Sequence, residues 1–394
     1  MTRVGLVGLG FMGKTHLGVY QRLSNVEVTA VCDTREENLN ITSLSAGGNI
    51  RTSEGKIDLS KASKYSDYSK MLESGSFDYV DICLPTFLHA KYTVQALEAG
   101  YHVFCEKPMA LTVGETKQML ETASRKGRLL GIGQCMRFWP AYVEVKRLIE
   151  SGTYGKLRYA EFARYSAPAQ WAWNRWLANS SLSGNAALDL HIHDVDMILW
   201  LFGKPASVKS KGIFEKDGSI SHITTFYSYD GKVVQASGGW ICSDSFGFNM
   251  QAFYILENAT IDLDFSKNPT VTVYPSGAQK YPLAFADDDG YFYELKDFVE
   301  GVEKGRGSGI VTGQSAADSV ALCLLEIESA TEGKEKGLNY AIRKHVVRYD
   351  ARIGGQGSYS RPYGDHHNVR KPFRFPTNLL TWQQTQAKVD DLGE

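Results

Sequence analysis

A glutamate and a lysine stand together at the end of a short apolar run, where packing alone gives no reason for them. The run 103–105 is followed by Glu106, Lys107 and Pro108. Proline cannot donate to a central sheet and therefore ends a strand, while lysine is costly to bury. We expect a strand that delivers both charges at its carboxyl end, where open α/β sheets bind ligands. A solvated strand exit is the simpler alternative. We also expect a cis peptide bond before Pro108.

A second pair of reactive side chains lies in the apolar stretch 184–202. Asp189 and His193 are four residues apart, which places them on one face of a helix. Imidazole can accept a proton near neutral pH, and a nearby carboxylate can orient it or bind a substrate hydroxyl. A solvated i,i+4 pair is the alternative. His191 and His193 do not face each other on a helix and no third ligand is suitably spaced, so we expect no metal site.

Three glycines near the start indicate a nucleotide site. Gly8, Gly10 and Gly13 form G-x-G-x-x-G between an apolar run and a helical stretch, with Phe11 and Met12 inside the motif. Such glycines allow a tight turn, close approach of the backbone to a pyrophosphate, and packing of the helix on the strand. The helix N-terminus presents free N–H groups to the phosphates. The pattern predicts a dinucleotide cofactor.

The next strand, 28–32, ends in Asp33, which lies 20 residues after Gly13. A carboxylate at this point can accept hydrogen bonds from both ribose hydroxyls and repels a 2′-phosphate, so we expect NAD rather than NADP. Arg35 favours the opposite choice, because an arginine there can accommodate the phosphate. An aspartate that caps the next helix is the alternative.

The elements around these residues define a first domain, 1–138. Strands and helices alternate, which predicts a doubly wound parallel sheet, and residues 40–66 read as an inserted loop without a chemical signal. Glu106 is expected to contact the nicotinamide ribose or to orient Lys107. The other cofactor contacts expected at the ends of later strands are Leu84, Pro85, Thr86, His89, Lys107 and Gln134.

A second domain, 139–340, shows period-2 alternation typical of a mostly antiparallel sheet, with helices 292–304 and 315–331 closing it.

Several tryptophans of this domain are candidates for substrate binding, because aromatic faces suit the C–H face of a sugar ring. A place in the core or in an interface explains these tryptophans equally well. The residues expected around the substrate are Arg137, Trp139, Trp173, Asn174, Trp176 and His191.

Composition narrows the partners and the compartment. The 394 residues carry a net charge of −1, which gives no electrostatic reason to expect nucleic acid or a membrane. The six cysteines are scattered without zinc-site spacing, and we see neither a signal peptide nor a membrane span. We expect a cytoplasmic homodimer or homotetramer.

The C-terminal residues 341–394 differ in composition from the rest of the chain. They are basic, glycine-rich and aromatic, and we interpret them as an extended C-terminal arm.

The glycine motif, Cys105-Glu106-Lys107-Pro108 and the Asp189–His193 stretch together resemble the Gfo/Idh/MocA family of NAD(P)-dependent oxidoreductases. The resemblance implies a Rossmann domain and a C-terminal α+β domain with a large open sheet. It implies a sugar, inositol or related polyol as substrate and a catalytic group of Lys107, Asp189 and His193. The glycine-rich entry to the helix departs from the family pattern, because it reads Gly184-Asn185-Ala186 here.

We therefore expect a dehydrogenase that moves a hydride between a secondary hydroxyl and a nicotinamide cofactor. His193 would act as general base, Lys107 would stabilise the developing alkoxide, and Asp189 would bind a neighbouring hydroxyl. Two alternatives stay open: an NAD-dependent glycosidase that oxidises its sugar transiently, and a non-catalytic NAD-binding regulator.

Overall fold

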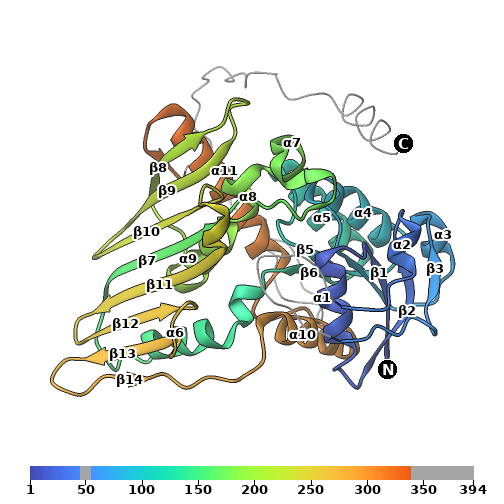
Figure 1. Cartoon of the computed structure of the whole chain (residues 1–394), viewed down its shortest axis with the longest axis horizontal. Helices are drawn as coiled ribbons and strands as arrows, with labels where there is room; N and C mark the ends of the chain where they lie inside the picture. Colours follow the sequence, from blue (N-terminus) through green and yellow to red (C-terminus); the bar gives the residue numbers. More distant parts are fainter. Residues whose placement is uncertain (45–54, 339–394) are drawn as a thin grey trace, which may run out of the picture. The chain divides into compact units, whose positions relative to one another are not determined.

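The first domain is built on a parallel sheet, as the alternating pattern predicts. The computed structural model describes residues 1–44 and 55–338, and its first sheet has the order β3-β2-β1-β4-β5-β6 (Figure 1). All neighbouring strands in it run parallel. Its central strands are apolar and buried because helices cover both faces. The strands are β1 Thr2–Val7, β2 Val26–Cys32, β3 Ser63–Tyr65, β4 Tyr79–Ile82, β5 His102–Glu106 and β6 Leu130–Gly133.

Strand β3 corrects the expectation of a featureless loop over 40–66. It is three residues long, pairs with the end of β2, and exposes Ser63 and Lys64. A short polar edge strand carries no apolar alternation, so the sequence pattern gives no signal for it.

The helices that connect the strands of the first sheet are α1 Phe11–Tyr20, α2 Glu36–Leu39, α3 Tyr68–Glu73, α4 Thr86–Glu98 and α5 Val113–Lys126.

The second sheet has nine strands in the order β14-β13-β12-β11-β7-β10-β9-β8-β15. Strands β7 and β10 are parallel and the other neighbours are antiparallel, which confirms a mostly antiparallel sheet. The strands are β7 Leu157–Ser166, β8 Ser207–Phe214, β9 Ile220–Tyr229, β10 Lys232–Gly239, β11 Phe248–Leu256, β12 Ala259–Asp264, β13 Val271–Pro275, β14 Tyr281–Pro282 and β15 Lys336–Gly337.

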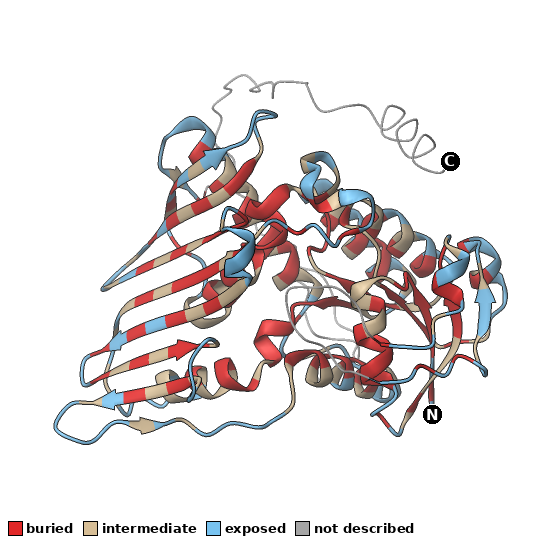
Figure 2. Cartoon of the chain, viewed as in Figure 1, coloured by how far each residue is buried: buried red, intermediate tan, exposed pale blue. Residues whose placement is uncertain are grey.

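The two faces of this sheet differ. Buried and exposed residues alternate along its strands, visible as coloured stripes in Figure 2. One face packs on helices α8 Asn185–Asp189, α9 Ile192–Phe202 and α11 Gly313–Glu332 (Figure 1). The opposite face leaves large apolar side chains in solvent, namely Phe226, Val233, Phe253, Ile255 and Tyr274.

One helix of the second sequence domain packs on the first sheet. Helix α10, Gly290–Lys304, was expected to close the second domain together with α11. Its Phe298 ring instead contacts Tyr79 and Phe104, each with a centroid distance of 5.2 Å. The remaining short elements are η1 Cys135–Phe138, α6 Pro140–Glu150, η2 Trp173–Ala178, α7 Ser180–Ser183 and η3 Asp244–Phe246.

No helix in the described ranges is both long and apolar enough to span a membrane. The predicted arm, 341–394, lies outside the described residues.

Candidate active site

Lys107 lies at the carboxyl end of β5 and reaches into the second domain. Its Nζ donates to the main-chain oxygen of Asp189 at 2.9 Å and to the Asp189 carboxylate at 3.3 Å. The lysine side chain is only 15% exposed and that of Asp189 12%. The Lys107–Pro108 peptide bond is cis, as predicted. The two residues that were expected to act together are therefore in direct contact.

A break in the second-domain helix creates the acceptor for Lys107. The sequence predicts one helix through Asp189 and His193, whereas α8 ends at Asp189 and α9 begins at Ile192. In a continuous α-helix the His193 N–H would bond the Asp189 carbonyl. Here it points to the Leu190 carbonyl at 3.4 Å. The Asp189 carbonyl is thus left for the ammonium group of Lys107.

His193 is held as a neutral base. Burial, and then the charges of Lys107 and Arg164, lower the pKa of His193 well below its ordinary value. Arg164 is itself 2% exposed and forms a paired hydrogen bond with Asp194, at 2.9 and 3.2 Å. No protein partner is found for the His193 Nδ1 atom within the described part of the chain. An uncharged imidazole beside a lysine can accept a proton from a bound hydroxyl.

The glycine turn fits a dinucleotide. Gly8 has φ +87°, and a Cβ on Gly13 would lie 1.9 Å from the Gly8 carbonyl oxygen, so both positions require glycine. A Cβ on Gly10 would meet nothing within 4 Å, which leaves room beside the start of α1. Met12 lies in the first turn of that helix and is half-buried against the core. These features match a turn built around a pyrophosphate.

Asp33 stands where the ribose acid is expected, at the end of β2. One carboxylate oxygen accepts from the backbone N–H of Leu9 at 2.8 Å and from Asn38 at 2.9 Å. The other accepts from the Arg35 N–H at 2.9 Å. The acid is oriented by the backbone, and the second oxygen keeps a lone pair for a further donor.

The nicotinamide end is marked by buried polar atoms. Leu84, Pro85 and Thr86 form the turn from β4 into α4, and Gln134 follows β6. The Thr86 hydroxyl and both amide atoms of Gln134 have no protein partner among the described residues. Because buried polar groups in proteins are nearly always paired, a bound polar molecule would suit these positions. The residues present therefore fit the cofactor.

A buried ionic network, which the sequence reading missed, supports Glu106. His16 in α1 lies 2.8 Å from an Asp81 oxygen through Nδ1 and 3.1 Å from a Glu106 oxygen through Nε2. The other Glu106 oxygen accepts from the Lys107 backbone N–H at 3.1 Å. Glu106 thus contacts the backbone N–H of the residue that it is expected to orient. The only sequence signal for this network is a histidine in the helical stretch five residues after Phe11.

The network also contains an unpartnered acid from α10. One ligand atom each from His16, Glu106 and Glu294 lies within 4.8 Å of the others, and Asp81 and Cys83 form a similar group with His16. Such spacing suits a metal ion as well as a proton-sharing network. Neither Glu294 oxygen has a hydrogen-bond partner among residues 1–44 and 55–338. Burial, followed by the charge of Glu106, raises the pKa of Glu294 well above its ordinary value, which favours the protonated form of this acid.

Three predicted ligand-binding residues have protein partners in the structure. His89 is 1% exposed, and its ring nitrogens lie 2.7 Å from the carbonyl oxygens of Pro108 and Leu84. Arg137 is 4% exposed and donates two 2.7 Å bonds to Asp196. His191 is fully buried, with Nε2 2.9 Å from a Glu326 oxygen. Each of these three side chains thus contacts a protein group in this structure.

The predicted substrate residues lie in several different surroundings. Trp139 packs between Phe265 and Tyr291. Trp176 belongs to a small apolar cluster of the second domain, and Asn174 has a positive φ of 46°. Trp173 lies against Arg35 of the first domain. The structure thus brings none of these side chains into a described contact with Lys107.

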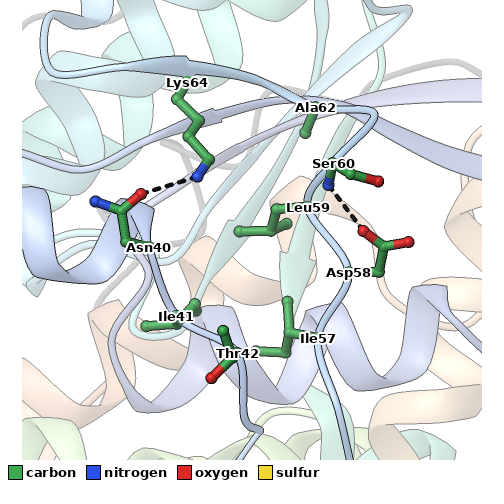
Figure 3. Close-up of a pocket in the computed structure, with 9 residues that line it drawn as sticks. All are labelled: Asn40, Ile41, Thr42, Ile57, Asp58, Leu59, Ser60, Ala62 and Lys64. Atoms are coloured by element: carbon green, nitrogen blue, oxygen red, sulfur yellow. Dashed lines mark hydrogen bonds between the residues drawn. The ribbon is translucent and has the colours of Figure 1, made fainter.

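A hollow of about 390 Å³ lies elsewhere on the first domain (Figure 3). Its polar contacts are internal, from Lys64 Nζ to Asn40 at 3.0 Å and from the Ser60 N–H to Asp58 at 2.9 Å. The lining contains none of the predicted site residues; it consists of Asn40, Ile41, Thr42, Ile57, Asp58, Leu59, Ser60, Ala62 and Lys64.

Comparison with known proteins agrees with this geometry. Residues 2–134 match the sequence profile described as oxidoreductase family, NAD-binding Rossmann fold, and residues 142–255 match the GFO/IDH/MocA C-terminal domain. The chain belongs to the Gfo/Idh/MocA family. Membership confirms the resemblance stated from the sequence, the Rossmann domain and the nicotinamide cofactor.

Relatives of this family member include myo-inositol 2-dehydrogenase of Thermotoga maritima, 27% identical over 77% of this chain and 89% of the relative. D-glucoside 3-dehydrogenase of Escherichia coli is 29% identical over 58% of this chain and 62% of the relative. Among solved structures, levoglucosan dehydrogenase in complex with NADH and levoglucosan aligns with a TM-score of 0.71. It is 18% identical and covers 86% of this chain and 99% of that one, so it shows the shared fold.

Proposed function

We propose that the protein is an NAD-dependent dehydrogenase that oxidises a secondary hydroxyl of a sugar, glycoside or inositol-like polyol. The observation that carries the proposal is the contact of Lys107 with Asp189 across the two domains, beside a neutral His193. The substrate class is supported by the named activities of the relatives, which act on inositols and a glucoside.

Each residue of the catalytic group has a separate task. The nicotinamide cofactor, when bound, accepts the hydride. His193 takes the hydroxyl proton, which its lowered pKa permits at neutral pH. The Lys107 ammonium stabilises the negative charge that develops on that oxygen. Asp189 holds Lys107 through two acceptors and offers its carboxylate to a neighbouring hydroxyl.

We further propose that the first domain holds the cofactor at the carboxyl ends of its strands, with each part of the cofactor at a different strand end. The glycine turn would hold the pyrophosphate, and Asp33 would hold the adenosine ribose and, through its charge, favour NAD. The β4 and β5 ends hold the nicotinamide half. Titration with NAD and NADP, followed by calorimetry, tests this: equal affinities for both would overturn the preference.

The activity test uses purified protein, NAD and a panel of inositols, sugars and glycosides, with NADH absorbance as readout. Lys107→Ala should lower kcat by about 10²–10⁴-fold, the range of lost acid–base and electrostatic catalysis, while NADH affinity changes little. Lys146→Ala is the matched control, because Lys146 is also mostly buried, at 17% exposure, but pairs with Glu150 away from the site. Wild-type turnover in Lys107→Ala would refute the catalytic group. Aglycone release without NADH would indicate a glycosidase.

The exposed face of the second sheet supports a homo-oligomer. Its apolar side chains lie in register across neighbouring strands: Val233 and Ile255 both flank Tyr159 of β7. Contiguous apolar patches of this kind usually mark an interface. We propose a homodimer or homotetramer that buries this face. Light scattering should show a multiple of the chain mass, and Phe253→Glu combined with Ile255→Glu should reduce it; a wild-type monomer would contradict the proposal.

A further inference from the structure

The segment 167–178, which follows β7, connects the second domain to both cofactor turns of the first. Its inner residues are anchored in the second domain: Ala172 and Leu177 are buried in one cluster with Leu190 and Trp240. The Ala167 N–H also donates to the Gly247 carbonyl at 2.8 Å. Leu190 directly follows Asp189, so the anchor of this segment adjoins the catalytic helix break.

The outer residues of the segment contact the first domain at two positions. The Trp171 ring lies 5.2 Å from the Phe11 ring, which is inside the glycine motif. The Arg35 guanidinium lies 5.9 Å from the centre of the Trp173 ring. Both turns, β1–α1 and β2–α2, are those that the family uses for NAD. Two indoles from the second domain thus meet the pyrophosphate turn and the adenosine turn.

The contacts of Arg35 indicate which part of the cofactor Trp173 would face. The arginine Nε lies 3.7 Å from an Asp33 oxygen, and the guanidinium carbon lies 5.9 Å from the centre of the Trp173 ring. A planar guanidinium that contacts both a carboxylate and an aromatic ring is restrained and presents a flat surface. Such surfaces stack well on a purine. Trp171 and Trp173 are nevertheless 40% and 38% exposed, so neither indole belongs to a core.

We propose that Trp171 and Trp173 form the outer wall of the cofactor site and close over the adenosine diphosphate half of NAD from the second domain. Release of the cofactor then requires this segment to leave Phe11 and Arg35. Asn174 and Arg175, both with positive φ, form the sharp turn directly after the second indole. The proposal goes beyond the proposed reaction and depends only on NAD binding, not on the sugar substrate.

The test measures cofactor binding without a substrate. Trp171→Leu and Trp173→Leu should each raise the NADH dissociation rate about 5-fold, as expected for a lost stacking or cation–π contact, and the double variant should raise it more. Trp200→Leu is the control, because Trp200 also faces a cation, Lys146 at 4.9 Å, but within the second domain. Its dissociation rate should equal that of the wild type.

Calorimetry with ADP-ribose separates the two halves of the cofactor. Both indole variants should bind ADP-ribose about 5-fold more weakly, with melting temperatures close to wild type because the indoles are exposed. ADP-ribose affinity and NADH release within twofold of wild type in the double variant would overturn the proposal. So would weaker NADH binding with unchanged ADP-ribose binding, since that places the indoles at the nicotinamide half.

Discussion

At the scale of single residues, the site combines charged and uncharged titratable side chains that lie close together. The Lys107 ammonium contacts Asp189, His193 is kept neutral by burial and by positive neighbours, and Glu294 is kept neutral by burial and by Glu106. Each neutral group lies close to a charged one, which is the usual arrangement of a site that moves protons. The protonation states of His193 and Glu294 lead to two measurements.

The first measurement concerns His193. A base must be unprotonated to act, and the pKa of His193 is lowered by burial, then by Lys107 and Arg164. We expect kcat/KM for alcohol oxidation to stay high below pH 6.5 and to fall only as the pH drops through the lowered pKa. NMR titration of the His193 ring in the free enzyme should give the same value. A midpoint at or above pH 6.5 would contradict this assignment.

The second measurement concerns Glu294. Its raised folded pKa means that the unfolded chain ionises first, so this group costs stability as the pH rises above its ordinary pKa of 4.5. Glu294→Gln mimics the neutral acid and should melt at least about 2 °C higher than wild type at pH 8, with the gain vanishing toward pH 4.5. The facing charges, Glu106, His16 and Asp81, remain unchanged in this variant. Equal loss of stability at both pH values would show that Glu294 is ionised.

At the scale of elements, local pattern predicted the strands and helices well where each buries a regular face. The alternation of β9 and β11 and the capped helix α5, with its Thr112–Glu115 box, follow from nearest-neighbour rules. The break after Asp189 does not, because residues 188–202 contain neither the glycine nor the proline that usually marks such a break. The break depends on partners from distant strands and from Lys107, which sequence spacing cannot reveal.

The same limit explains why the protein partners of three predicted site residues could not be foreseen. His89, Arg137 and His191 each contact a group 19 to 135 positions away, although His89 also contacts Leu84, five positions away. His16 was missed because its partners Asp81 and Glu106 come from two other strands. Lys107, Asp33 and the glycine turn do follow strand ends, as the sequence predicts, because the apolar run before each of them marks the strand without further information.

Glu326 contacts His191, which stands at the break between α8 and α9, and this contact leads to a prediction. This acid in α11 accepts from Thr225 at 3.1 Å and lies 2.9 Å from the His191 ring, at the start of α9. Glu326→Ala leaves a buried donor without a partner and should lower the free energy of unfolding by about 1–3 kcal/mol. Glu326→Gln keeps an acceptor and should lose less. Denaturant unfolding measures both, and equal losses would show that packing alone matters at this position.

At the scale of the whole molecule, the junction of the two domains is held by a buried ion pair. Arg137 lies in η1, where the first sheet ends, and Asp196 lies in α9 of the second domain. The arginine also donates to the Ile310 carbonyl at 3.1 Å, and Ser319 donates to Asp196 at 2.7 Å. Three segments that are distant in sequence thus meet at one guanidinium, close to the helix that carries His193.

This junction gives the last prediction. Arg137→Met removes one partner and leaves the Asp196 carboxylate buried, so the variant should lose about 3–5 kcal/mol of unfolding free energy. Adding Asp196→Leu removes the orphaned charge and should restore much of that loss, because the desolvation cost disappears with it. The exposed pair of Arg3 and Asp78 is the control, with side chains 47% and 37% exposed, and Arg3→Met should leave the melting temperature nearly unchanged. If Arg137→Met were as harmless as Arg3→Met, the pair would not hold the junction. The double variant could also prove no more stable than Arg137→Met alone. In that case Arg137 would support the helix that carries the catalytic base through its shape and packing, and not by neutralising Asp196.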